Sequence, residues 1–162
     1  MADQRDLARE LLGLAKDDRA AAAALLDVAG VSDAIVAFHA QQAVEKSLKA
    51  VLASGGVDFP LTHNLAALLQ PCEDADVDVP AELEAADLLT PYAVAARYGS
   101  KSPATVDRAA ALQFAAAAVR PAAGAVATLT RPLARAGRSA DGKSASDATL
   151  EGLRDGPSAA VP

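Results

Sequence analysis

Apolar residues recur at three- and four-residue steps along most of the chain, which is the spacing of amphipathic helices. The pattern predicts a first helix over residues 5–28, which Gly30 ends. It predicts a second helix that begins at Ser32 or Asp33 and ends at the Gly-Gly pair at 55–56. The apolar positions of the first helix are expected to face the core: Leu7, Leu11, Leu14, Ala15, Ala22 and Leu25.

A short third helix is predicted over residues 63–70, with Thr62 as its N-terminal cap and Pro71 as its end. The acidic residues at 73–78 that follow predict a solvated loop. Cys72 lies in this connection and is expected to have no role. It is the single cysteine of the chain, which excludes an intrachain disulfide and a thiolate metal cluster.

Capping residues and prolines mark the remaining helices. A segment that begins near Pro80 meets Thr90, which is expected to cap a fresh turn leading into residues 92–98. The Ser-Pro pair at 102–103 repeats this start and predicts a long final helix, which Pro121 interrupts or kinks. Together these elements predict an all-α, up-and-down bundle of four to five helices.

Composition supports one helical domain. With 162 residues, 52% of them hydrophobic, the chain is long enough for one core and too short to expect two. The apolar residues are mostly Ala, Leu and Val, and aromatics make up 3%, which favours closely packed helices. We expect this domain to cover residues 1–130. Residues 131–162 are rich in Gly, Ser and Ala, so a disordered tail is expected there.

Charge and hydropathy limit the possible partners. A net charge of −6 argues against a large surface that follows nucleic-acid phosphates, although a local basic cleft is still allowed. The chain contains no run of about 18 apolar residues, and its N-terminus is polar without a signal-peptide core. We therefore expect a cytoplasmic protein that does not associate with membranes.

The second helix has an apolar stripe and a polar side. The stripe is expected to face the core: Val36, Ala40, Ala43, Val44, Ser47, Leu48 and Val51. Phe38, Gln41, Gln42, Glu45 and Lys49 lie on the other side, where Glu45 and Lys49 form an i,i+4 pair worth a few tenths of a kcal/mol if exposed. A phenylalanine on a solvent-facing side predicts a contact, either with a flanking helix or with a second copy of the chain. We therefore expect a homodimer with Phe38, Gln42 and Glu45 at its interface.

Two histidines are the candidates for proton transfer. His39 shares a flank of the second helix with Lys46, and together they have the chemistry to position a phosphate. The alternative for His39 is a half-buried ring that bonds a neighbouring carbonyl or carboxylate. His63 follows Thr62, where a structural contact to the preceding loop is expected. Neither histidine has the spacing of a metal site, so no metal is expected.

Three short stretches resemble the HEPN domains, in the same order and at about the same spacing. They are FHAQQAVEKSLKA at 38–50, THNL at 62–65 and YAVAARY at 92–98, and the resemblance covers roughly residues 5–120. HEPN domains are small all-helical modules often encoded beside minimal nucleotidyltransferases. They commonly pair through helical faces, with a cleft between the subunits. The resemblance therefore implies a helical bundle, a second subunit and a nucleotidyltransferase partner.

The resemblance also implies a test for ribonuclease activity. Many HEPN proteins are metal-independent ribonucleases whose site is an Arg, four to six residues and a His, in which Arg stabilises phosphate charge and His moves a proton. Arg97 has no His at that spacing, and the same holds for the other arginines, so the motif is absent. Asn64 stands where an Asp is more usual after His63. Only a substitute proton carrier such as His39, brought close by folding, would complete a site with Arg97.

These observations leave three hypotheses. The preferred one is a non-enzymatic or weakly active binding partner of a minimal nucleotidyltransferase, in a toxin–antitoxin-like or substrate-presenting complex. The second is a homodimeric metal-independent ribonuclease toxin that uses Arg97 and His39. The third is a stand-alone nucleotide-binding module without a cofactor. The residues expected to bind nucleotide or RNA are His39, Lys46, Lys49, Arg97 and Tyr98.

Overall fold

The computed structural model describes residues 4–98 and 106–129, and for residues 96–98 it describes the backbone alone. The described elements are α1 (Gln4–Leu25), α2 (Asp33–Ser54), α3 (Ala66–Asp74), the 3-10 helix η1 (Ala81–Leu89), α4 (Thr90–Tyr98) and α5 (Arg108–Thr128). No strand occurs among these residues, which confirms the predicted all-α bundle. The tail expected at 131–162 lies outside the described part of the chain.

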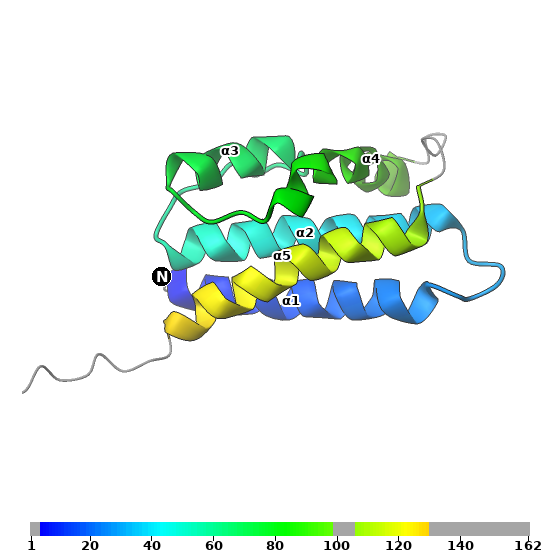
Figure 1. Cartoon of the computed structure of the whole chain (residues 1–162), viewed down its shortest axis with the longest axis horizontal. Helices are drawn as coiled ribbons and strands as arrows, with labels where there is room; N and C mark the ends of the chain where they lie inside the picture. The colour runs from blue at the N-terminus through cyan, green and yellow to red at the C-terminus, as the bar shows by residue number, and fades with distance from the viewer. Residues whose placement is uncertain (1–3, 99–105, 130–162) are drawn as a thin grey trace, which may run out of the picture. The chain divides into compact units, whose positions relative to one another are not determined.

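Helix α2 is the central element of the bundle. It contacts α1 along its length and also packs against α5, α3, η1 and α4. Figure 1 shows the chain reversing direction between α1 and α2 and again before α5, while α3 and α4 lie on the side of α2 opposite α1. Because neighbours surround α2, its predicted apolar stripe is buried, apart from half-buried Val51, and so is much of its other side.

The core-facing side of α1 differs from the one predicted. Ala8, Leu12, Ala15 and Ala22 are buried, whereas Leu7 and Leu14 are 38% and 44% exposed. The prediction of Leu7 and Leu14 as core residues was therefore wrong. The buried positions lie on a different side of the helix from Leu7 and Leu14, so α1 packs into the bundle through three alanines and Leu12.

The start of α3 is capped by a residue that the sequence pattern did not single out. Thr62 was expected to cap a helix over 63–70, but α3 begins at Ala66. The Asn64 side-chain oxygen accepts a hydrogen bond from the Ala67 backbone N–H at 3.0 Å, which is the usual capping interaction. Thr62 instead accepts from the Asn64 N–H at 3.1 Å and so shapes the preceding turn.

Two prolines lie inside helices that they were expected to end or interrupt. Pro71 is within α3, which continues to Asp74, and Pro121 is within α5, which continues to Thr128. Each proline removes one backbone donor, but tertiary packing of these helices offsets that loss. The prediction of a solvated acidic loop at 73–78 is also partly wrong, since Val77 packs against the hydrophobic core.

The start of α5 is fixed by Asp107 and Arg108. The Asp107 carboxylate accepts from two backbone N–H groups of the first turn, whereas the predicted Ser-Pro start at 102–103 lies outside the described residues. The Arg108 guanidinium bonds the Asp33 carboxylate at 2.6 Å. It also donates to backbone carbonyls between α1 and α2: Leu25, Leu26, Val28 and Val31. Arg108 therefore ties α5 to the α1–α2 connection.

By length and composition, α5 is the one helix among the described residues that is apolar enough to cross a membrane. It packs against both α1 and α2, and its buried positions are mostly alanines. A core helix of a helical bundle has this same composition.

Candidate functional site

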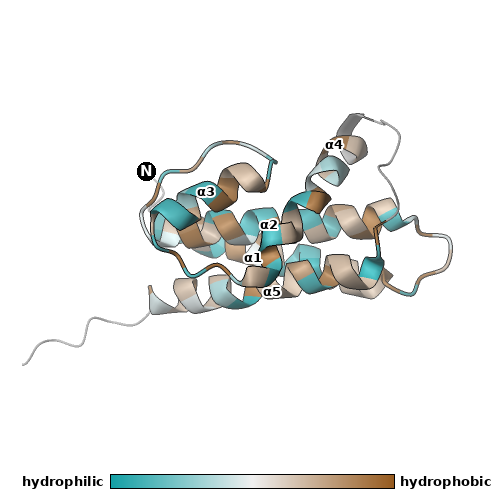
Figure 2. Cartoon of the chain, turned by 45° about the horizontal axis from the view of Figure 1, so that its top comes forward, coloured by the Kyte–Doolittle hydropathy of each residue, from teal (hydrophilic) through white to brown (hydrophobic). Residues whose placement is uncertain are grey.

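The polar side of α2 is buried inside the bundle. Gln41 is 0% exposed, Gln42 is 7% exposed and Glu45 is 4% exposed. Figure 2 shows hydrophilic segments along α2 among hydrophobic neighbours. The expectation that these residues face solvent was therefore wrong. The chain segment around Thr62 and the facing helix α1 cover this side of α2, and the buried groups bond to them.

Glu45 is the centre of the buried network. Lys49 Nζ lies 2.8 Å from Glu45 Oε1 and also donates to the Thr62 carbonyl at 2.9 Å. The Gln41 amide donates to Glu45 Oε2 at 3.0 Å and to the His63 carbonyl at 3.0 Å. His63 Nδ1 lies 3.0 Å from both carboxylate oxygens. His63 therefore makes a structural contact with Glu45 of α2, whereas the contact expected from the sequence was with the preceding loop.

These contacts determine the charge state of Glu45. Burial alone would raise the pKa of its carboxyl, but hydrogen bonds from Lys49, Gln41 and His63 outweigh burial, so the pKa lies below its ordinary value of 4.5. Glu45 is therefore ionised at neutral pH. The pair with Lys49 is a buried ion pair, with side chains 5% and 11% exposed, and not the exposed pair expected from the sequence.

Asp18 of α1 is the centre of the second half of the network. Its carboxylate accepts from Lys46 Nζ and lies 2.9 Å from His39 Nδ1. Lys46 also donates to the Gln42 side-chain oxygen at 3.1 Å, and the Gln42 amide donates to Gln41 at 2.7 Å. The two carboxylates are thus joined through the glutamines into one continuous chain of hydrogen bonds.

A family model named HEPN domain matches residues 8–122, which include most of α1, all of α2 and the whole buried network. The chain belongs to the HEPN domain family. A comparison with curated proteins and one with solved structures found no match to the chain. In this HEPN domain, the stretch at 38–50 that carried the resemblance is the central part of the core helix.

The HEPN domain brings His39 and Lys46 together, as expected, but both contact the Asp18 carboxylate and not a phosphate. The pairing with Asp18 is the alternative foreseen for His39, a half-buried ring held by a carboxylate. Phe38 is also half-buried, and its ring meets the His39 ring edge to face at 5.4 Å between centroids. Phe38 was expected to be covered by a flanking helix or by a second copy; the chain itself covers part of it, and the homodimer stays a prediction.

Other candidates lie away from this network or outside the described side chains. Arg97 and Tyr98 are the last residues of α4, and their side chains are not among those described. Burial, with the nearby Glu73 charge, raises the pKa of the Cys72 thiol to about 11, so this buried cysteine is not a nucleophile at neutral pH. No group of His, Cys, Asp and Glu in the described residues has the arrangement of a metal site.

Asp18 is the network residue that sequence reasoning missed. It is one of two adjacent acidic residues on α1, and helical periodicity alone does not distinguish it from exposed Asp17. Its partners lie 21 and 28 residues further along the chain. Their pairing depends on how α1 packs against α2, which one sequence does not specify.

Proposed function

We propose that this HEPN domain is a cytoplasmic, non-catalytic binding partner of a minimal nucleotidyltransferase, in a toxin–antitoxin-like or substrate-presenting complex. The supporting observation is that both histidines of the chain already contact carboxylates of the same chain: His39 contacts Asp18, and His63 contacts Glu45. The chain also lacks an Arg followed at the ribonuclease spacing by a His. The nucleotidyltransferase partner comes from the branch of the family that the three sequence stretches resemble.

The network favours a structural role for these groups. A ribonuclease needs a histidine that reaches the 2′-hydroxyl or the leaving oxygen, and a cation that is available to the phosphate. Lys46 is bonded to Asp18, and Lys49 is bonded to Glu45 and to a backbone carbonyl. A phosphate would have to compete with these carboxylates for both lysines. The same argument weighs against a stand-alone nucleotide-binding module built on Lys46 and Lys49.

One contact favours the ribonuclease as the second candidate. A carboxylate on Nδ1 is the arrangement that orients a histidine so that its other nitrogen can take a proton, and Asp18 has this position relative to His39. The His39 side chain is 29% exposed, so solvent reaches it. In a homodimer, Arg97 of a second copy is the group that would complete such a site.

Direct binding to a minimal nucleotidyltransferase tests the proposal, and the protein to use is one encoded in an adjacent reading frame, if that frame carries the nucleotidyltransferase motif. The two purified proteins are mixed and followed by light scattering coupled to gel filtration and by titration calorimetry. We expect a stoichiometric complex with a dissociation constant at or below about 1 μM, which corresponds to about 8 kcal/mol. If the mixture contains only the separate proteins at tens of micromolar, the proposal fails. The same light-scattering run of the HEPN protein alone tests the predicted homodimer.

An RNA-cleavage assay on the HEPN protein alone and on its mixture with the nucleotidyltransferase separates the two candidate functions. The binding-partner proposal predicts a complex and no cleavage by the HEPN protein alone. The ribonuclease candidate predicts metal-independent cleavage by the HEPN protein alone, which His39→Ala abolishes. The ribonuclease candidate also predicts that Asp18→Asn reduces this cleavage, because Asp18 lies on His39 Nδ1. Asp17→Asn is its matched control, because Asp17 is an exposed neighbour on the same helix.

A further inference from the structure

An apolar cavity lies between α2, α5 and the connection from α3 to η1. Its volume is about 240 Å³, and its walls include Leu48 and Val51 of α2, Leu83 of η1 and Ala118 of α5. Several wall residues, such as Val51, are half-buried, so solvent reaches the cavity. An engineered apolar cavity of about 150 Å³ already holds benzene, so this one has room for a ring with a short substituent.

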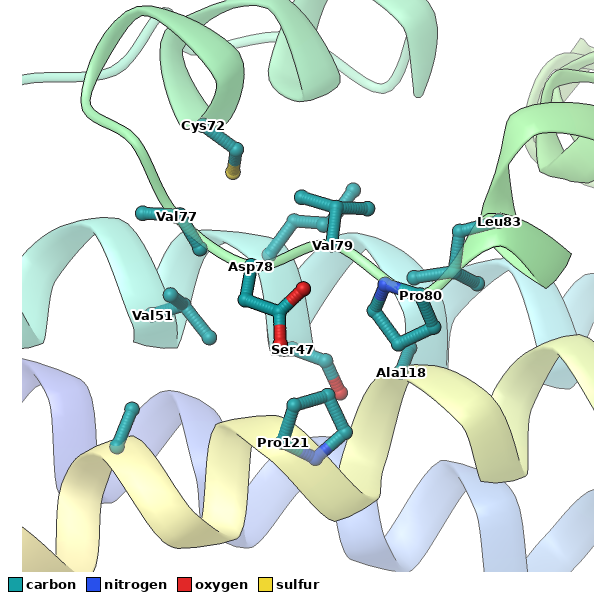
Figure 3. Close-up of a pocket in the computed structure, with 12 residues that line it drawn as sticks. Ser47, Val51, Cys72, Val77, Asp78, Val79, Pro80, Leu83, Ala118 and Pro121 are labelled. Atoms are coloured by element: carbon teal, nitrogen blue, oxygen red, sulfur yellow. The ribbon is translucent and has the colours of Figure 1, made fainter.

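One wall residue has an unsatisfied polar group. Ser47 is 1% exposed, and its hydroxyl has no hydrogen-bond partner among the residues that the structure describes. Figure 3 shows the Ser47 hydroxyl pointing across the cavity toward Pro121 of α5. Ser54 on the same helix behaves differently, since its hydroxyl bonds the Val51 carbonyl at 2.7 Å. Buried hydroxyls are nearly always bonded, so the orphaned Ser47 hydroxyl indicates a partner from outside the chain.

A negative charge also lines the cavity. Asp78 is an exposed residue that lines the cavity, and among the described residues it has no ion-pair partner. Figure 3 shows its carboxylate directed toward the space between α2 and α5. Glu73 and Glu84 border an adjoining hollow that Asp78 also lines. These carboxylates give the mouth of the cavity a negative potential, which favours a cation.

We propose that this cavity binds a small organic amine. The hydrocarbon part of the amine packs against Leu48, Val51 and Leu83, while its ammonium group pairs with the Asp78 carboxylate. The Ser47 hydroxyl accepts a hydrogen bond from the bound amine, because a serine oxygen accepts as well as donates. The cavity lies apart from the buried network around Glu45 and Asp18, so this proposal does not depend on the nucleotidyltransferase partnership.

Benzylamine is the probe that tests the proposal. It is titrated into the ¹⁵N-labelled full chain, and backbone amide shifts are followed by NMR. We expect saturable shifts centred on the amides of Ser47, Val79 and Ala118, with a dissociation constant in the low millimolar range or below, as is usual for a fragment of this size. Benzyl alcohol, which has the same shape without the charge, is expected to bind about two- to fivefold more weakly, and benzoate not to bind.

Two substitutions and their matched controls locate the site. Asp78→Asn is expected to weaken benzylamine binding about two- to fivefold and to leave benzyl alcohol unchanged. Asp76→Asn is the control, because Asp76 lies outside the cavity and its φ of 51° suits asparagine. Ser47→Ala is expected to weaken binding while raising the melting temperature of the free protein, because it removes an unsatisfied hydroxyl. Ser54→Ala is the control on the same helix and is expected to leave the affinity unchanged.

Three results overturn the proposal. They are the absence of saturable shifts with benzylamine, benzoate binding as tightly as benzylamine, and full affinity in the Asp78→Asn variant. Because Asp78 is exposed, its substitution leaves the fold intact, and the test stays decisive whatever Ser47→Ala does to folding.

Discussion

Glu45→Gln is the substitution that tests the buried network most sharply. Glutamine keeps the shape of the side chain but removes its negative charge and one of its two acceptor oxygens. Lys49, whose side chain is 11% exposed, then has no opposite charge, and the bonds from Gln41 and His63 to the carboxylate are weakened. The perturbation therefore leaves an unpaired cation in the core.

The expected magnitude follows from burial. An exposed i,i+4 pair would cost a few tenths of a kcal/mol when broken. Removing one partner of a buried ion pair typically costs ~3–5 kcal/mol. Lys49 keeps its bond to the Thr62 carbonyl, so we expect a loss of about 2–4 kcal/mol for Glu45→Gln. That is a large part of the 5–15 kcal/mol (roughly) by which a domain of this size is stable.

The assay is urea unfolding at pH 7, followed by far-ultraviolet circular dichroism and fitted to a two-state transition. A double-mutant cycle with Lys49→Met isolates the pair, and the double variant is expected to lose at least about 1 kcal/mol less than the sum of the single losses. Glu10→Gln is a control on an exposed carboxylate of α1. If the unfolding free energy of Glu45→Gln lies within about 0.5 kcal/mol of that of the unmodified protein, the Glu45–Lys49 pair does not stabilise the fold as a buried ion pair should, and the reasoning is wrong.

Three further predictions follow from the same contacts. Because the pKa of Glu45 is lowered in the folded state, its ionised carboxylate stabilises the fold fully above about pH 4.5, and this stabilisation is lost as the pH falls below that value. The difference in unfolding free energy between the unmodified protein and Glu45→Gln, measured in urea, should therefore be smaller at pH 3 than at pH 7. Arg108→Ala should reduce the free energy of unfolding by about 2 kcal/mol, since it removes a partly exposed ion pair and several carbonyl partners; a loss below about 0.5 kcal/mol would contradict its role. Cys72, whose thiol pKa is raised to about 11, should react with iodoacetamide at pH 8 far more slowly than a free thiol, because very little of it is thiolate at that pH; a rate near that of a free thiol would contradict the raised pKa.

The bundle was predictable from sequence because helical periodicity and end signals are local. Ser32 and the Gly-Gly pair at 55–56 bound α2 where predicted, and Gly56 has the positive φ of 71° that favours glycine. The errors come from tertiary context. Pro71 and Pro121 lie inside helices that packing maintains, and Leu7 is exposed because it lies off the side of α1, with Ala8 and Leu12, that packs against the bundle.

The candidate site was predictable only in part. Sequence placed His39 and Lys46 on one flank of α2 and Glu45 beside Lys49, and the structure brings these pairs together. The sequence did not reveal that the polar side of α2 is buried. A hydrophobic pattern indicates which side of a helix is apolar, but not which sides are covered by neighbouring elements. The contact from Asp18 to His39 and Lys46 joins two helices. Such a contact depends on helix packing, which one sequence does not encode locally.

Metal-free RNA cleavage by the purified chain, with EDTA present, tests the central claim most directly. His39→Ala and Asp18→Asn are prepared in parallel, which also controls for contaminating nuclease. General acid–base help typically contributes about 10²–10⁴-fold to a rate. If His39 is a structural residue, as the contacts indicate, all three proteins give the same background rate. Rapid cleavage by the unmodified protein that both substitutions abolish would contradict the account and establish the Asp18–His39 pair as part of a ribonuclease site.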